Sequence, residues 1–112
     1  MTTITFTYKK NNNITSLVGI KATGHSGYAD KGSDIVCASI STLIFTLIIG
    51  LSEIESIPSF KAQINDKDDL IKASWSQKYS PRVNLLSRSI EKSLRRIAAN
   101  YSDYVKITEV FI

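Results

Sequence analysis

The chain has 112 residues, of which 43% are hydrophobic and 21% are charged, a composition typical of one soluble globular domain. Its net charge of +4 permits attraction to nucleic acid or other acidic surfaces but does not demand it. The single cysteine excludes an intramolecular disulfide, and one cysteine with one histidine cannot supply the four ligands of a structural zinc site.

The chain is predicted to open with a β-hairpin. In residues 2–9, Ile4, Phe6 and Tyr8 alternate with threonines, which is the pattern of a half-buried strand. Asn11–Asn13 has turn chemistry. A second strand follows, with Ile14, Ser16, Val18, Ile20 and Ala22 at alternate positions. The first residues lack the basic-then-apolar layout of a signal peptide, so we expect a cytoplasmic protein.

A glycine-spaced loop leads to a predicted helix from Ser33 or Asp34 to Ile49. Either residue is a good N-cap, and Gly50 is a natural stop. The run Ile35–Leu51 is strongly apolar, but it is shorter than the ~20 residues of a membrane span and contains serine and threonine. We therefore expect a buried helix and no membrane association. Its C-terminal half is apolar on nearly all sides and must be covered by the sheet and by a second helix or a partner chain.

Residues 60–64 and 71–75 alternate between apolar and polar and are predicted strands, joined by the polar turn 66–69. Ser80 and Pro81 predict the start of a second helix, with Ser80 as N-cap and Pro81 as the first helical residue. Its apolar stripe comprises Val83, Leu86, Ile90, Leu94, Ile97 and Tyr101. A last strand over residues 104–112 completes a ββαββαβ order. This order predicts a single compact α+β domain over residues 1–112, with two helices packed on a largely antiparallel sheet.

The segment from Gly24 to Ser41 holds the only histidine and the only cysteine of the chain. Cys37 falls in the first turn of the predicted helix, where unpaired N–H groups and the helix dipole favour the thiolate. His25 ends a predicted strand, and a loop of this length can bring its ring beside the sulfur as a general base and acid. Taken singly, a cysteine is more often a small buried hydrophobe, and a histidine is more often solvated or hydrogen-bonded.

Other residues of this segment have both a structural and a functional interpretation. Asp34 is either an N-cap, worth ~1 kcal/mol, or a residue that orients His25. Ser41 shares a helical face with Cys37 and either lines the same pocket or bonds back to a helix carbonyl. The loop contains three glycines that would allow it to open and close, as a plain surface turn also would: Gly24, Gly27 and Gly32.

Gly24-His25, the glycine-spaced loop and the sequence DIVCAxxS from Asp34 to Ser41 together resemble the signature of the ribosomal-processing cysteine protease family, Prp. The pairing of GH with DIVCAxxS at this separation is specific, and the length and element order of the chain fit as well. The resemblance implies that Cys37 is the nucleophile and His25 the general base, while Gly24, Asp34 and Ser41 match other characteristic positions. The chain departs from the family pattern in two ways: Ser26 and Ser39 stand where small apolar residues are more usual, and its charge balance is more basic than expected.

The resemblance also implies a substrate and a partner. Such enzymes remove an N-terminal extension from large-subunit ribosomal protein twenty-seven, cutting after a hydrophobic segment that ends in phenylalanine, and they are usually homodimers. We expect acyl transfer without metal or cofactor, with backbone N–H groups at the helix start stabilising the oxyanion. The loop 26–33 would close over the substrate. Tyr28 would either pack on an aromatic substrate side chain or anchor the loop.

Two other functions remain open from the sequence. The first is a non-catalytic RNA- or ribosome-binding module, because the exposed face of the second predicted helix carries Arg88, Lys92, Arg95 and Arg96. Such a run is more often a solvated face, and a weak attraction to RNA or the ribosome is also compatible with a protease. The second is a redox sensor using Cys37, which has no resolving cysteine in its own chain.

Overall fold

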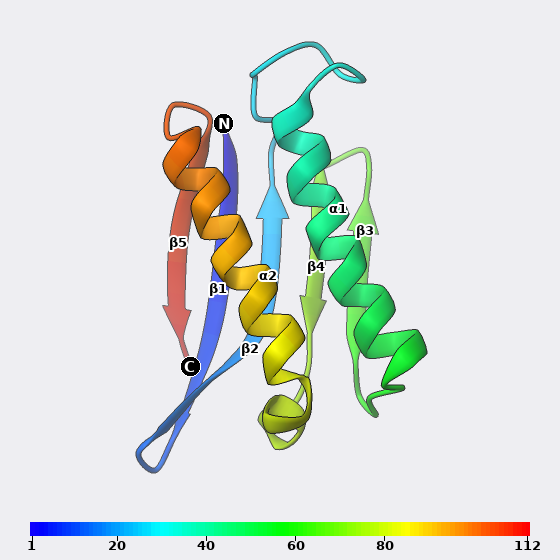
Figure 1. Cartoon of the computed structure of the whole chain (residues 1–112), viewed down its shortest axis with the longest axis vertical. Coiled ribbons are helices and arrows are strands. Elements are labelled where there is room, and N and C mark those ends of the chain that lie inside the picture. Colours follow the sequence, from blue (N-terminus) through cyan, green and yellow to red (C-terminus); the bar gives the residue numbers. More distant parts are fainter.

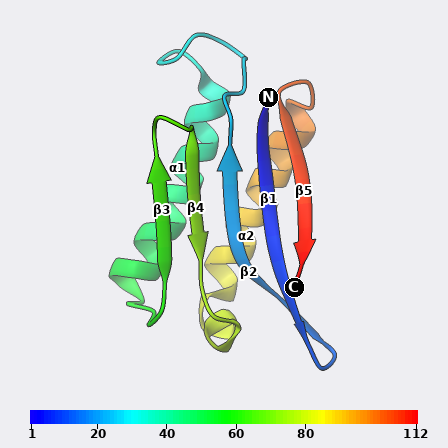
Figure 2. The same cartoon turned by 180° about the vertical axis from the view of Figure 1, so that it is seen from behind.

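A five-stranded sheet carries both helices on one of its faces (Figure 1). The computed structural model describes all 112 residues. The strand order is β3-β4-β2-β1-β5, and neighbouring strands are antiparallel except for β1 and β5, which are parallel. The predicted α+β class and the ββαββαβ order are confirmed. Seen from behind, the other face of the sheet carries no helix (Figure 2).

The elements fall close to their predicted positions. The strands are β1 (Thr2–Asn11), β2 (Ile14–Thr23), β3 (Lys61–Asn65), β4 (Leu70–Ser74) and β5 (Val105–Phe111). The helices are α1 (Ile35–Ile49) and α2 (Ser80–Asn100), with a π-helical turn η1 (Gly50–Ile54) after the first and a 3₁₀ turn η2 (Gln77–Tyr79) before the second. The core lies between the sheet and the helices, with Ile4, Phe6, Ile20, Ile44, Leu47 and Leu94 among its fully buried side chains.

The β1–β2 hairpin turns at Asn12, whose φ of 54° is left-handed. A bulge shifts the register between Thr7 and Tyr8, so that Tyr8 lies opposite Leu17. Because side chains alternate along a strand, this shift brings Leu17 into the core cluster, while Val18 is also buried but lies outside that cluster. The simple alternation predicted for residues 14–22 is therefore wrong at its first half.

The α-helix ends at Ile49, as predicted, but Gly50 does not stop the helical path of the chain. It has helical dihedrals (φ −59°, ψ −44°), and the chain continues through η1. A Cβ atom at this position would lie 2.3 Å from Cδ2 of Leu86 on α2. The glycine therefore permits the two helices to approach closely and does not act as a stop.

Together, α1 and η1 form a helical segment of 20 residues, Ile35–Ile54, which by length and composition alone would suffice to cross a membrane. One side of the segment is enclosed by the sheet and α2, as in the core helix of a soluble domain: Val36, Ile40, Ile44, Leu47 and Leu51 are at most 2% exposed. The other side is less covered, and Phe45, Ile49 and Ile54 are exposed. The chain therefore covers two sides of this helix and leaves an apolar strip on a third.

The second helix begins one residue earlier than predicted. Tyr79 occupies the N-cap without a capping side chain, and Ser80 is the first helical residue. The Ser80 hydroxyl instead donates to the carbonyl of Leu17 on β2 at 3.2 Å. The predicted stripe is confirmed, since Val83, Ile90 and Leu94 are buried, while Leu86, Ile97 and Tyr101 pack against the core.

Candidate active site

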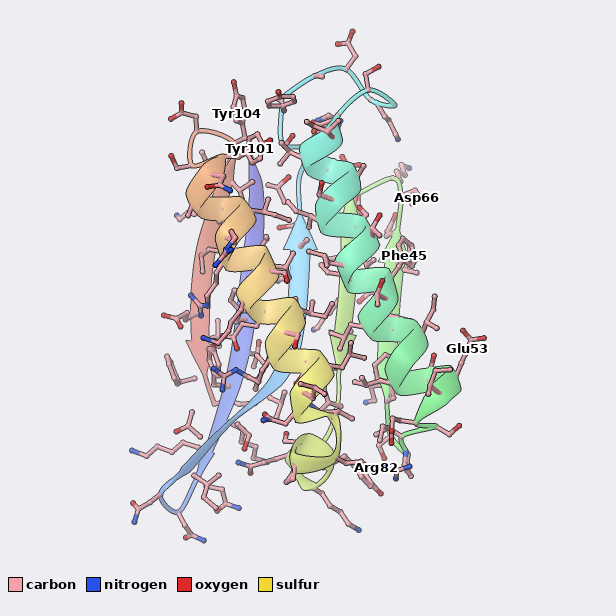
Figure 3. The ribbon with its side chains drawn as sticks, in the orientation of Figure 1. Phe45, Glu53, Asp66, Arg82, Tyr101 and Tyr104 are labelled. Carbon is pink, nitrogen blue, oxygen red and sulfur yellow. The ribbon has the colours of Figure 1, made fainter.

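A cavity of about 490 Å³ lies beside the first turns of α1 and contains both Cys37 and His25 in its lining. Its walls come from α1, β2, the β3–β4 hairpin and the loop between β2 and α1. Its apolar part consists of Ala22, Ala38, Phe45, Ile64, Leu70 and Ile71, and its polar part includes Lys31, Asp66 and Asp69. Phe45 and Asp66 lie on the side of α1 that faces β3 (Figure 3). The sequence had already indicated Ser41, Asp34 and the loop glycines beside the dyad, but not the walls that come from β2, Phe45 and the β3–β4 hairpin.

Asp34 caps α1 and holds the start of the helix in place. Its Oδ1 atom accepts from the peptide N–H groups of Val36 and Cys37, both at 3.0 Å, and its Oδ2 atom accepts from the Ser26 hydroxyl. Burial alone would raise the pKa of Asp34, but the hydrogen bonds from Ser26 and from the Cys37 peptide outweigh it and lower this pKa to about 2. Asp34 is thus an ionised N-cap, as predicted, and the alternative cap, Ser33, is not used.

Ser26 connects the cap to the sulfur. Its peptide N–H donates to Sγ of Cys37 at 3.3 Å, while its hydroxyl donates to Asp34 and accepts from the Tyr28 peptide N–H at 3.2 Å. The residue is buried. In the sequence, Ser26 stood out only as a departure from the family pattern, and no spacing rule indicated that it would link these groups.

His25 lies beside both groups. Its nearest ring nitrogen, the Asp34 carboxylate and the Cys37 sulfur lie within 4.8 Å of one another. Its Nδ1 atom is 3.6 Å from Oδ2 of Asp34 and accepts the Gly27 peptide N–H at 3.3 Å. Such a triad could offer ligands to a metal ion, but both carboxylate oxygens already accept hydrogen bonds.

The start of β1 also reaches the sulfur. Thr2 is buried, and its hydroxyl donates to the carbonyl of Gly24 at 3.0 Å and lies 3.9 Å from Sγ of Cys37. Gly24 has a φ of +85°, and a Cβ atom there would lie 2.7 Å from the carbonyl oxygen of Met1. A side chain at this position would therefore be strained and would push the two strands apart beside His25. The sequence analysis singled out Gly24 but missed Thr2.

The two remaining predicted residues behave differently. Ser41 lines the cavity, and its hydroxyl does not bond back to a helix carbonyl, as that of the neighbouring Ser39 does to Ile35. Tyr28 does not line the cavity. It packs edge-on against Tyr101 and Tyr104, with ring centroids 5.6 and 5.3 Å away. Both partners lie at the connection between α2 and β5, next to the loop (Figure 3). Of the two expected roles, the structure shows the loop anchor.

Known proteins are similar to this chain in sequence and in fold. The family model of cysteine protease Prp matches residues 1–106. The ribosomal processing cysteine protease Prp of Mycoplasma genitalium is 30% identical over 95 residues, which cover 79% of this chain and 84% of that protein. The crystal structure of SMU.848 from Streptococcus mutans has a TM-score of 0.80 at 25% identity, covering 100% of this chain and 96% of that one.

The fold is also that of a ribosomal processing protease Prp from Staphylococcus aureus, solved with a covalently linked product peptide. That structure has a TM-score of 0.72 at 20% identity and covers 95% of this chain and 98% of its own. The match of the family model over nearly the whole chain and the similarity to the Mycoplasma protein decide the assignment. The chain belongs to the ribosomal processing cysteine protease family Prp and is a cysteine protease.

Proposed function

We propose that Cys37 is the nucleophile of this protease and His25 its general base and acid. The observation that carries the proposal is the position of the Cys37 sulfur. It lies within 4.8 Å of a His25 ring nitrogen, accepts a peptide N–H from Ser26 and borders a cavity with an apolar wall. Membership of a cysteine protease family favours this reaction over a redox sensor, for which the chain has no resolving cysteine.

The reaction proceeds in two stages. After His25 has taken the thiol proton, Sγ of Cys37 attacks the carbonyl carbon of the scissile bond and forms a tetrahedral intermediate. The C–N bond then breaks, and His25 delivers the proton to the departing amine. Water attacks the remaining thioester while His25 takes a proton from it. The acid product leaves, and the thiol is restored.

We propose a different oxyanion donor from the one expected from the sequence. The peptide N–H groups of Val36 and Cys37 at the helix start already donate to Asp34. The peptide N–H of Ser26 points at Sγ, the atom that bonds to the carbonyl carbon in the intermediate. We therefore assign oxyanion stabilisation to the Ser26 N–H. One donor of this kind typically contributes ~3 kcal/mol to transition-state stabilisation.

The proposed substrate is the N-terminal extension of large-subunit ribosomal protein twenty-seven, cut after a phenylalanine. The family resemblance supports the choice of this substrate. The apolar part of the cavity supports a phenylalanine before the cut, because it could accept an apolar side chain. A covalently linked product peptide in the relative from Staphylococcus aureus supports an acyl-enzyme route. The cleavage position can be tested with a synthetic peptide that carries an apolar segment ending in phenylalanine. Mass spectrometry of the products should show that the bond directly after this phenylalanine has been cut. An intact peptide, or a cut elsewhere, would contradict the substrate assignment.

Phe45→Ala is expected to lower kcat/KM for such a peptide by roughly 10-fold or more, because loss of apolar contact in a hydrophobic pocket costs about 1–3 kcal/mol. Phe45 lines the cavity and is partly exposed, so the fold should tolerate the change. Ile35→Ala is the matched control, since Ile35 is exposed on the same helix outside this cavity.

A second peptide, with alanine in place of the phenylalanine, makes the test specific. If Phe45 contacts the substrate phenylalanine, Phe45→Ala should lower kcat/KM only slightly for the peptide that has alanine in its place. An equal loss of kcat/KM on both peptides would show that Phe45 does not form this subsite.

We further propose a homodimer, in keeping with the family resemblance. The apolar strip left on α1 and η1 borders a groove of about 510 Å³ together with α2, lined by Ile49, Ile54, Leu85 and Leu86. Leu85 is 85% exposed, an unusual position for a large apolar side chain that has no partner. In sedimentation velocity, the protein should be a dimer and Leu85→Glu a monomer, while Ile14→Glu on the exposed hairpin should stay dimeric. A monomeric parent protein would refute the dimer.

Acidic residues pair with part of the basic run on α2, which makes the RNA-binding alternative less favoured there. Arg88 pairs with Glu91 at 2.7 Å, and Arg95 pairs with Glu91 and Glu109 at 3.2 and 2.8 Å. These acids neutralise part of the charge that the sequence suggested for phosphate binding.

Cytoplasmic location remains our proposal, supported by the ribosomal class of the named relative, and cell fractionation tests it.

A further inference from the structure

The sheet face turned away from the helices lies toward the viewer in Figure 2. Four of its strands each contribute a lysine to this face. Strand alternation places these lysines there, since the residues beside them, such as Ile20, Ala22, Ile71 and Ala73, belong to the core on the helix side. We call this surface the lysine face: Lys21 on β2, Lys61 on β3, Lys72 on β4 and Lys106 on β5. Lys61, Lys72 and Lys106 are exposed, and Lys21 is half-buried.

No acidic residue balances this charge within the face. The lysines are interspersed with hydroxyl side chains, namely Thr3, Thr5, Thr7, Thr23 and Thr108, which the strand register places in the same rows. Glu109, the one acidic residue of β5, lies on the helix side and pairs with Arg95. None of the ion pairs of the protein involves a lysine.

The placement of two of the lysines costs stability. Lys21 and Lys72 are direct cross-strand partners in the antiparallel β2–β4 pair. Directly opposite residues have Cβ atoms about 4.5–5.5 Å apart, and like charges at that distance destabilise a sheet. Gln63 and Thr5 flank the pair on the neighbouring strands, so no carboxylate offsets the repulsion. A local conflict of this kind indicates a functional use, and a bound anion would relieve it.

We propose that the lysine face binds the phosphodiester backbone of RNA. Lysine ammonium groups and threonine hydroxyls are donors that proteins use toward phosphate oxygens. Neighbouring strands lie about 4.8 Å apart, so β3 and β5 are separated by about 19 Å, enough for several phosphates. The face has no aromatic side chain on which a base could stack, so binding should depend little on base sequence.

Charge excludes a second copy of this chain as the occupant, because two lysine faces would repel each other. The choice of RNA over DNA rests on the proposed ribosomal substrate. The binding of an anion to this face does not depend on that proposal. The proposal differs from the binding module expected from the sequence, which would use the basic residues of α2. The two surfaces lie on opposite sides of the sheet (Figures 1 and 2).

The test is fluorescence anisotropy of a dye-labelled RNA hairpin titrated with the whole protein between 50 and 200 mM salt. If four phosphates are neutralised, the binding constant should fall roughly 100-fold over this range, corresponding to a log–log slope of about −3 to −3.6. Replacing both Lys21→Gln and Lys72→Gln should make the slope less steep by about 2 and weaken binding at 50 mM salt by roughly tenfold or more.

The matched control removes two charges from the helix side, through Lys92→Gln and Arg96→Gln, and should leave the affinity nearly unchanged. Equal weakening by both double variants, or no binding to the hairpin at 50 mM salt, would overturn the proposal. Tighter binding to a DNA duplex or to poly-glutamate would overturn the choice of RNA.

Peptide cleavage is measured on the same samples. RNA binding without cleavage would contradict only the proposed protease substrate, and cleavage without RNA binding would contradict only the lysine face.

Discussion

Cys37→Ala is expected to lower kcat for peptide cleavage by roughly 10⁴-fold or more, because removal of a nucleophile ends covalent catalysis. The fold should survive. Cys37 is only partly buried, and the change leaves one peptide N–H, that of Ser26, without its sulfur acceptor. The loss of one such hydrogen bond costs about 1 kcal/mol. Cleavage rates measured beside thermal unfolding curves separate the two effects.

Two further variants make this result specific. Cys37→Ser should be nearly as inactive, because a hydroxyl does not supply a comparable anion at neutral pH. Ser39→Ala, two residues along the same helix, removes an exposed hydroxyl that bonds only to the carbonyl of Ile35, and it should cut at the normal rate. A Cys37→Ala protein that cleaves as fast as its parent would exclude this sulfur from the reaction.

Asp34→Ala is expected to destabilise the protein by about 2–3 kcal/mol, which lowers Tm by roughly 10 °C for a domain of this size. The change removes the N-cap of α1 and leaves the buried Ser26 hydroxyl without its acceptor. It should also lower kcat at temperatures where the protein remains folded, because Ser26 and the first turn of α1 set the position of the sulfur. Asp30→Ala, in the exposed part of the same loop, is the control and should change neither quantity.

The pH dependence of the same variant tests the cause. The folded-state pKa of about 2 for Asp34 lies below its ordinary value of 3.8, so the folded state favours the charged carboxylate. This stabilisation is fully present above about pH 4 and is lost as the pH falls through about 2, and it amounts to about 2 kcal/mol. The stability difference between the parent and Asp34→Ala should therefore shrink on acidification. Parallel curves of unfolding free energy against pH would contradict the low pKa.

The order of elements could be predicted because each one has a local periodicity that packing preserves. The errors occur where contacts between distant segments override a local signal. Gly50 looked like a helix stop but serves the close contact with Leu86. Ser80 looked like a cap, yet its hydroxyl bonds to Leu17 on another strand. The bulge that moves Leu17 into the core lies next to Gly19, and simple alternation does not take account of such a glycine.

The same distinction applies to the site. Cys37 and His25 were recognisable because each is the only residue of its type and the spacing matches a family signature. Thr2 and Ile64 reach the cavity region from strands far away in sequence, so only the sheet order and register bring them there. Tyr28 was ambiguous between substrate and anchor, because its partners on the α2–β5 connection are seventy residues or more along the chain.

The parallel pairing of β1 with β5 has a practical consequence for anyone handling this protein. The register joins Thr2 to Val105 and Tyr8 to Phe111, so the chain starts beside Cys37, whereas β5 ends about 20 Å further along the sheet. An affinity tag or dye fused ahead of Met1 would therefore lie close to the Cys37 sulfur. Attachment after Ile112 keeps it away from that sulfur, and kinetic assays are best built on such a fusion.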